Sequence, residues 1–421
     1  MNVPLLIISY FSVYIFLFLL YSFVRKKFSI NATSFLFLLY AFSGVCSYIF
    51  YLFSNGVNRN YSNITTTPFI YLVLCIIISL LPIYRYDNFS PQIVISKRQF
   101  EIIDSLSYVL VFCCVLPLIE TIVYLPNAFS SDTFIGEMYD KRLMGIDVQD
   151  YLSWISRKFY YVIMLCSLLL PVCLFVQLKK KAVNTKLVIG LVFSVILDAL
   201  HNMINGGRSR FMQNLLYIII VYFLFKNQIS NNNRNKIRIG GLIAMSVSAL
   251  AMMVVTISRF INDNSGIYDN SFIWLTLYAG EGPLNFNNDL WYVDKTVGGY
   301  NTCGLIIGVL SGHFVTVREL WQLGDKLGVA GNIFYTWIGT LCMDWGKLST
   351  FIIVLLSSFS VFSFIVKRRK MTIVSFILMC LGARILVLGP IFYTYATIES
   401  QYCLLVCFLF CLLLNSRIAN R

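Results

Sequence analysis

Stretches of about 20 consecutive apolar residues recur along this chain, and an α-helix of that length crosses the hydrocarbon core of a membrane. We find about eleven of them by this criterion. They cover residues 3–24, 33–53, 67–84, 102–124, 157–178, 186–204, 211–225, 239–257, 348–366, 371–390 and 400–414. The sequence therefore predicts an all-α polytopic membrane protein with about eleven transmembrane helices.

The composition supports this prediction. Of the 421 residues, 58% are hydrophobic and only 12% are charged, whereas about a quarter of the residues of a soluble protein are charged. We expect one integrated helical bundle rather than a string of domains. No basic residue precedes the first apolar span, so we expect this span to be retained as a helix and not cleaved as a signal peptide.

Lysine and arginine collect after the odd-numbered spans, in segments with almost no acidic residues. Examples are RKK at 25–27, KKK at 179–181 and KRRK at 367–370. Acidic residues occur instead in the alternate segments, as between positions 132 and 150. Cytoplasmic segments are the basic ones, which predicts an N-terminus outside and a C-terminus in the cytoplasm. Topology thus explains most of the net charge of +14, and nucleic acid is not expected as a partner.

This orientation places a long segment, 258–347, on the outer side. The predicted organisation is eight helices in 1–257, an external segment in 258–347, and three helices in 348–421. Long segments outside regular helices are usually functional. The chain has no phosphate-binding loop motif, which argues against a primary pump, and no internal repeat that would support an inverted-repeat transporter.

Four polar residues near the end of the sixth span recur at helical spacing. They are Asp198, His201, Asn202 and Asn205, at positions i, i+3, i+4 and i+7. This spacing places them on one helix face. Lipid cannot solvate such a face, which predicts a protein-lined or watery cavity beside it. The alternative is that Asp198 pairs with an arginine only to hold two helices together.

Arginines occur at the predicted outer ends of several spans, namely Arg208, Arg210, Arg259 and Arg384. A guanidinium group binds phosphate through two parallel hydrogen bonds and keeps its charge at every relevant pH. This group of arginines could therefore hold a lipid-linked pyrophosphate at the level of the lipid headgroups. The alternative for Arg208 is that its side chain only extends to lipid phosphate.

Two motifs in the external segment mix aromatic, amide and acidic residues: YAGEGPLNFNNDLW at 278–291 and GNIFYTWIGTLCMDWG at 331–346. Aromatic rings stack on sugars and amides bind sugar hydroxyls. The candidate sugar-binding residues are Tyr278, Asn285, Asn287 and Tyr335. Aromatic residues also favour any membrane interface. The candidates for a general base are Glu281, Asp344, His313 and the pair of Asp198 and His201.

The cysteines do not suggest a metal site. Ten of the 12 lie in apolar spans, and the exceptions are Cys303 and Cys342. The sequence has no CxxC motif or Cys/His ligand spacing, and no DxD-like pair of carboxylates. We therefore predict neither a catalytic metal nor another cofactor.

Four stretches resemble those of the O-antigen polymerases, the Wzy-type polymerases of oligosaccharide repeat units. They are NGGRSRF at 205–211, TISRF at 256–260, YAGEGPLNFNN at 278–288 and GNIFYTWIGTLCMDWG at 331–346. The architecture is similar too, with many helices and one long external segment late in the chain. The resemblance is strongest over 201–346, and the first 150 residues add only hydropathy.

The resemblance implies a glycosyltransferase with a GT-C-like fold in the bacterial cytoplasmic membrane, acting on its outer face. Such enzymes transfer a growing glycan from undecaprenyl pyrophosphate to the next lipid-linked repeat unit. Membrane lipids, a chain-length regulator and a flippase are the implied partners. On this hypothesis Arg208, Arg210 and Arg259 stabilise the departing pyrophosphate, and His201, Glu281 or Asp344 accepts the proton of the acceptor hydroxyl.

Two other functions stay open from the sequence. An O-antigen ligase uses the same donor but transfers the glycan to the lipid A core. A lipid-linked oligosaccharide flippase also needs arginines and polar groups inside the membrane, although it rarely needs an external segment of this length.

Overall fold

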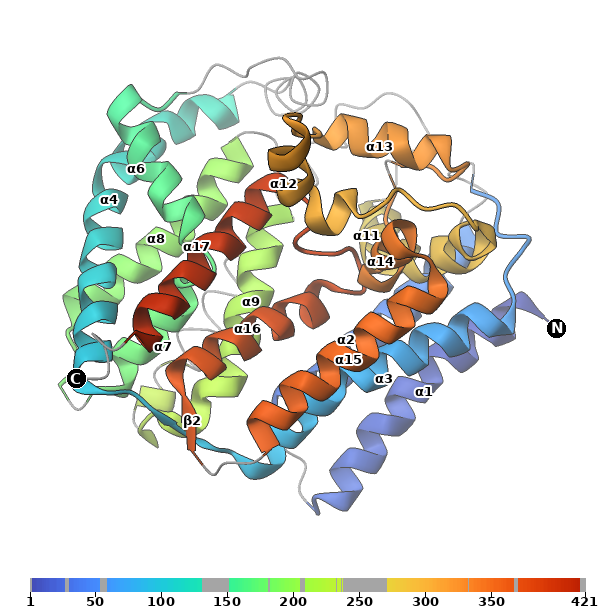
Figure 1. The fold of residues 1–421 in the computed structure, drawn as a ribbon, viewed down its shortest axis with the longest axis horizontal. Coiled ribbons are helices and arrows are strands. Elements are labelled where there is room, and N and C mark those ends of the chain that lie inside the picture. Colours follow the sequence, from blue (N-terminus) through green and yellow to red (C-terminus); the bar gives the residue numbers. More distant parts are fainter. Residues whose placement is uncertain are drawn as a thin grey trace. The chain divides into compact units, whose positions relative to one another are not determined.

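The computed structural model describes residues 2–26, 30–53, 59–130, 151–180, 182–204, 209–231, 233–235, 237, 271–331, 333–366 and 370–416. The regular structure of these residues is helical, apart from two strands of three residues each, so the predicted all-α class is confirmed (Figure 1). In this part of the chain six helices are long and apolar enough to cross a membrane, or seven if one bent pair counts as a span. Several long apolar helices indicate a multi-pass membrane protein.

Helices cover ten of the predicted spans, while the eighth, 239–257, lies outside the described residues. The candidate spans are fewer than the eleven predicted, partly because two helices are short. These are α9 (Ser209–Phe225) with 17 residues and α16 (Ile373–Leu388) with 16. The fifth predicted span, 157–178, is a bent pair of helices rather than one straight helix.

The chain divides into two compact units, each built from segments that are far apart in the sequence. Unit 1 comprises Met1–Pro91, Ile267–Met371 and Met379–Gln401. Unit 2 comprises Gln92–Gly266, Thr372–Leu378 and Tyr402–Arg421. These limits differ from the predicted division at residues 257 and 347, because helices from distant parts of the chain pack together within each unit.

Unit 1 contains most of the helices of the first and last thirds of the chain. They are α1 (Val3–Val24), α2 (Ala32–Phe53), α3 (Thr66–Phe89), α11 (Ser271–Asn288), η3 (Leu290–Tyr292), α12 (Tyr300–Ser311), α13 (Val317–Lys326), α14 (Trp337–Trp345) and α15 (Lys347–Val366). Unit 2 contains α4 (Lys97–Ser130), α6 (Trp154–Leu165), α7 (Leu170–Lys179), α8 (Thr185–Ile204), α9 and η2 (Lys226–Gln228). Helices α16 and α17 (Ile398–Asn415) have residues in both units, strand β1 (Gln92–Val94) opens unit 2, and the other strand is β2 (Lys370–Thr372).

Small residues along α2 let two helices approach it closely. A Cβ atom at Gly44 would lie 2.4 Å from Phe11 Cβ of α1, and one at Gly280 of α11 would lie 2.3 Å from the backbone nitrogen of Ser47. Small residues permit such backbone contacts between helices in membranes. Helix α11, which belongs to the segment predicted to be external, therefore packs directly against α2.

Pro283 lies inside α11 and has no N–H group to donate to the carbonyl of Ala279, four residues earlier. The hydroxyl of Ser43 donates to this carbonyl at 2.6 Å. The hydroxyl of Ser47 donates likewise to the carbonyl of Gly280 at 2.7 Å. Because side chains of α2 bind the backbone oxygens at this point, α11 continues through its proline.

Helices α3 and α15 of unit 1 run side by side in the same direction (Figure 1). Near their starts, the hydroxyl of Tyr71 donates to the carbonyl of Lys347 at 2.6 Å. Toward their other ends, the guanidinium of Arg85 lies 4.4 Å from the ring centre of Phe362. The side chain of Arg25, just after α1, donates to the carbonyl of Asp87 at the same end. Basic residues of unit 1 thus gather where the cytoplasmic side is predicted, although the orientation itself stays a prediction.

Unit 2 contains the bent pair, in which α6 and α7 meet at 72°. The proline ring of Pro171 would clash with the carbonyl of Ser167, four residues earlier, in a continuous helix. The chain forms turns from 166 to 169 instead. The break leaves carbonyls without a helical partner, and the hydroxyl of Tyr217 donates to that of Leu168 at 3.0 Å. Buried backbone oxygens at a helix break need such partners.

The structure contains no disulfide bond, because all 12 cysteines are free, including Cys303 and Cys342.

Candidate functional site

The strongest candidate site in unit 1 is centred on Glu281 of α11. Its side chain is only 2% exposed and forms an ion pair with Arg59, whose Nε lies 3.3 Å from Glu281 Oε1. Arg59 precedes α3 and its side chain is 36% exposed. A buried carboxylate is costly unless a cation and hydrogen bonds compensate it. The structure nevertheless keeps the Glu281 carboxylate buried, and buried ionisable groups of this kind are typical of functional sites.

The two glycines beside Glu281 fix its position. Gly280 faces the backbone of α2, and a Cβ atom at Gly282 would lie 2.6 Å from the carbonyl oxygen of Pro390. Any larger residue at either position would push the surrounding backbone away. Close packing on two sides therefore explains why Gly280 and Gly282 flank Glu281 in the sequence motif.

Two tyrosines complete what we call the Glu281 site, defined by Arg59, Tyr61, Glu281 and Tyr335. Both tyrosines are buried. The hydroxyl of Tyr61 donates to Asn285 at 3.1 Å. The hydroxyl of Tyr335 is buried and has no hydrogen-bond partner among the described residues. A buried hydroxyl without a partner is costly, so it is available to a ligand.

Burial raises the pKa of Glu281 above the usual range of a glutamate, and the positive charge of Arg59 opposes this shift. Burial also raises the pKa of Asp289, which follows α11. Burial and the charges of these two carboxylates raise the pKa of Tyr335. A carboxylate whose pKa moves toward neutrality is suited to exchange protons at physiological pH.

The asparagines of the predicted sugar-binding motif, Asn285 and Asn287, form hydrogen bonds with other segments of unit 1. Asn287 is fully buried; its Nδ2 donates to the carbonyl of Thr65 at 2.7 Å, and its Oδ1 accepts from the backbone N–H of Thr65 at 2.9 Å. Asn285 donates to the carbonyl of Phe334 at 3.0 Å. These bonds fix the segment that carries Arg59 and Tyr61. Direct sugar binding by Asn285 and Asn287 stays a prediction, but their side chains already have protein partners.

Asp344, a candidate base, stabilises the start of a helix. Its Oδ1 accepts from the backbone N–H of Asn301 at 3.1 Å and its Oδ2 from that of Thr302 at 2.7 Å, in the first turn of α12. Burial raises its pKa and these hydrogen bonds oppose the shift. The carboxylate is 1% exposed. An acidic residue that binds the first N–H groups of a helix satisfies donors that have no helical partner.

Two other predicted residues of unit 1 are less informative. Tyr278 is 40% exposed, and its ring centre lies 5.3 Å from that of Phe334. Arg384 is buried in α16. The described structure does not test the predicted role of either residue.

The second candidate, in unit 2, is the Asp198 network, defined by Tyr160, Asp198, Arg210 and Asn214. The carboxylate of Asp198 accepts from Tyr160 at 3.0 Å, from Arg210 Nη1 at 3.3 Å and from Asn214 at 2.7 Å. The Asn202 side chain accepts from the backbone N–H of Arg210 at 3.4 Å. Asp198 and Asn202 thus share one helix face, as predicted, and both bind the start of α9. The structure shows the helix-holding ion pair that was the alternative to a catalytic role.

The side chain of His201 contacts two tyrosines. Its Nδ1 lies 2.8 Å from the hydroxyl of Tyr151, which in turn lies 3.2 Å from that of Thr121. Its ring centre lies 4.0 Å from that of Tyr160. The imidazole therefore links α8 to the start of the bent pair and to α4.

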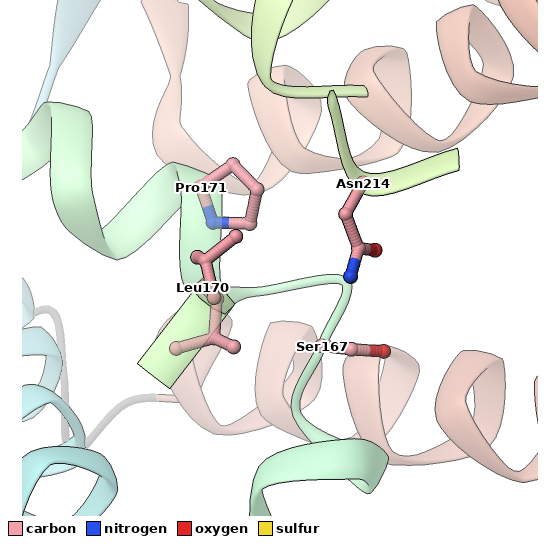
Figure 2. Close-up of a pocket in the computed structure, with 5 residues that line it drawn as sticks. Ser167, Leu170, Pro171 and Asn214 are labelled. Atoms are coloured by element: carbon pink, nitrogen blue, oxygen red, sulfur yellow. The ribbon is translucent and has the colours of Figure 1, made fainter. Parts of the chain in front are cut away.

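A small cavity adjoins the Asp198 network at the break between α6 and α7. Ser167, Leu170, Pro171, Val195 and Asn214 line it. Figure 2 shows the Asn214 amide directed toward the connection that carries Ser167. The cavity has a volume of about 10 Å³, which is room for about one water molecule. It is too small for a sugar or a pyrophosphate.

Three predicted residues, Asn205, Arg208 and Arg259, lie outside the described residues, so their roles stay predictions. His313 is exposed, and its Nε2 lies 3.2 Å from a carboxylate oxygen of Glu319. This contact is local, because Glu319 also forms the capping box of α13 with Thr316.

Arg59 is not among the residues predicted from the sequence. The sequence does contain a signal for it, because Arg59 is the only charged residue between the second and third spans, in a segment predicted to be outside. Basic residues are depleted on that side. An isolated arginine there is thus a better candidate than one of many in a cytoplasmic loop.

Within the described ranges, no group of three or more His, Cys, Asp or Glu residues could hold a metal ion. Comparison with protein-family models gives no match for the chain, and comparisons with curated proteins and with solved structures give none either. The family resemblance of the four sequence motifs stays a prediction.

Proposed function

We propose that this protein is a membrane glycosyltransferase that polymerises lipid-linked oligosaccharide repeat units on the outer face of the bacterial cytoplasmic membrane. The observation that carries the proposal is the ion pair of Glu281 and Arg59, with a nearly unexposed carboxylate, in a motif that resembles those of repeat-unit polymerases. The proposed substrates carry their own activation energy in the glycosyl pyrophosphate bond. No ATP or nucleotide sugar is needed on that side of the membrane.

In the proposed reaction Glu281 is the general base. Its carboxylate accepts the proton of the acceptor hydroxyl, while that oxygen bonds to the anomeric carbon of the donor glycan. The bond between this carbon and the pyrophosphate oxygen breaks, and the pyrophosphate leaves with the electron pair. The free hydroxyl of Tyr335 is suited to bind a sugar hydroxyl near Glu281. The arginines predicted from the sequence to bind pyrophosphate, Arg208, Arg210 and Arg259, belong to unit 2, and their role stays a separate prediction.

Glu281 is preferred over the other carboxylates because one of its oxygens has no hydrogen-bond partner among the described residues. Asp344 accepts three hydrogen bonds from the first turn of α12. Asp198 accepts from Tyr160, Arg210 and Asn214. Both are therefore committed to protein groups, whereas Glu281 Oε1 faces Arg59 without a well-formed hydrogen bond among the described residues.

The proposal is tested by glycan chain length in cells that carry Glu281→Gln. We expect single or very short repeats, because losing a general base slows a reaction by about 10²- to 10⁴-fold. A matched control is Glu101→Gln, an exposed glutamate of α4, which should leave chain length unchanged. Normal polymer from Glu281→Gln at normal protein level in the membrane would exclude Glu281 as the base. Normal polymer from both Arg208→Ala and Arg259→Ala would exclude the predicted pyrophosphate site.

One observation favours a second candidate, a flippase for lipid-linked oligosaccharides. Transporters commonly bind their substrates at broken helices, and the break between α6 and α7 adjoins the Asp198 network. Purified protein in detergent separates the two functions. A polymerase lengthens the glycan in the absence of a membrane, whereas a flippase leaves every lipid-linked unit at its original length.

A further inference from the structure

Arg59 lies where it can control the ionisation of Glu281. Its Nε is 3.3 Å from the carboxylate, and its side chain is 36% exposed. The rest of the surroundings of Glu281 contains no second cation in the described structure. The titratable groups that face Glu281 are Asp289, Tyr61 and Tyr335.

These neighbours act in opposite directions. The negative charge of Asp289 disfavours a second negative charge on Glu281, while the hydrogen bonds from Asn285 and from the backbone of Phe334 favour it. Both tyrosines are neutral at physiological pH. Among the described residues, Arg59 is therefore the one group whose full positive charge favours the carboxylate. At a separation of about 3 to 4 Å outside bulk water this is a strong interaction.

The position of Arg59 is itself fixed by the structure. The segment that follows it is held to the end of α11 by the side chains of Asn287 and Asn288, which bind Thr65 and Asn63. The hydroxyl of Tyr61 donates to Asn285 in the same helix. The amides of the NFNN motif thus place the arginine beside the carboxylate four to seven residues earlier in α11.

We infer that Arg59 is the positioning residue of the Glu281 site, where it keeps the buried carboxylate ionised and oriented toward the acceptor sugar. This inference rests on the proposed function for its link to catalysis. Arg59 does not exchange protons with the substrate. It sets the pH above which Glu281 can act as a base.

The test compares wild type, Arg59→Gln and Arg59→Lys in the pH dependence of polymerisation by purified protein. Glu281 works as a base only when it is ionised, so activity is present above its pKa and is lost as the pH falls through it. Removing the cation in Arg59→Gln moves this loss to higher pH. We expect activity at neutral pH to fall roughly tenfold or more and to recover in alkaline buffer. Arg59→Lys keeps a positive charge and should stay close to wild type.

The control is Arg318→Gln, an exposed arginine of α13 in the same unit. It should leave the profile unchanged. A merely structural role for Arg59 predicts a different result, namely equal loss of activity at every pH with no movement of the acidic limb. That result would overturn the inference.

A second measurement does not depend on turnover. Infrared difference spectroscopy follows the C=O band of protonated Glu281 during a pH titration, and the band is assigned by its absence in Glu281→Gln. We expect it to persist to higher pH in Arg59→Gln than in wild type. A shifted band without any polymerisation would contradict the proposed function and leave the role of Arg59 intact. An unshifted band would overturn the role of Arg59 whatever the activity.

Discussion

At the residue scale, the two candidate sites differ in how their carboxylates are satisfied. Asp198 accepts hydrogen bonds from three side chains, including the cation of Arg210. Glu281 accepts hydrogen bonds from Asn285 and the backbone of Phe334 and pairs with the partly exposed Arg59, but its Oε1 has no hydrogen-bond partner among the described residues. A fully satisfied buried carboxylate stabilises a structure, while an incompletely satisfied one keeps capacity for a ligand. This difference assigns a structural role to Asp198 and a chemical role to Glu281.

A prediction follows for Arg210→Gln. It leaves the carboxylate of Asp198 buried without its cation, and removal of one partner of a buried pair is destabilising. Because the Arg210 side chain is 23% exposed, solvent lessens the penalty, and we expect a loss of about 1–3 kcal/mol. Thermal unfolding of purified protein in detergent measures it, with Arg318→Gln as the exposed control. An unchanged melting temperature, together with loss of polymerisation, would assign Arg210 to the substrate instead.

Glu281, Tyr335, Asp198 and Arg210 could be predicted from the sequence, but most of their partners, such as Arg59, could not. Helical spacing correctly placed Asp198 and Asn202 on one face. Asn287, in contrast, binds Thr65, which is 222 positions away. Such pairs depend on how helices pack, and no local pattern contains that information.

At the element scale, the helices around two prolines, Pro171 and Pro283, differ in structure. Pro171 lies in the first turn of α7, where no N–H donor is needed, and the chain turns by 72° between α6 and α7. Pro283 leaves α11 continuous, because Ser43 of α2 donates to the freed carbonyl of Ala279. Hydropathy predicts one span at 157–178 and places 271–288 in the external segment. In both places side chains of neighbouring helices bind backbone oxygens that have no helical partner.

The role of Asp344 in stabilising the start of α12 leads to a prediction for Asp344→Asn. The amide places a donor against the backbone N–H groups of Asn301 or Thr302 and removes the charge at the helix start. We expect a loss of stability of about 1–3 kcal/mol, measured by thermal unfolding. The control is Asp294→Asn, whose side chain is 91% exposed and pairs with Lys347 at the surface. A surface pair of this kind contributes little.

The opposite outcome for Asp344 is equally specific. If Asp344→Asn unfolds at the wild-type temperature but no longer polymerises glycan, the carboxylate takes part in the glycosyl-transfer reaction and the predicted catalytic role is supported. Loss of stability with activity retained below the unfolding temperature supports the anchoring role.

At the scale of the whole molecule, composition and hydropathy predict the all-α class and most helix positions. They cannot predict the two units, because each unit combines segments from both halves of the chain. The segment 258–347, expected to be external, contributes α11, which packs on α2. Sequence order is therefore a poor guide to domains in this protein.

The most direct test of the proposed function is polymerisation by the purified protein. Wild-type protein in detergent is given a single undecaprenyl-pyrophosphate-linked repeat unit from its host, and the products are separated by gel electrophoresis. We predict a ladder of lipid-linked glycans that lengthens with time, and no ladder from Glu281→Gln folded to the same degree. If wild type leaves every unit at its original length while a lipid-linked unit is shown to be bound, the protein is not a polymerase.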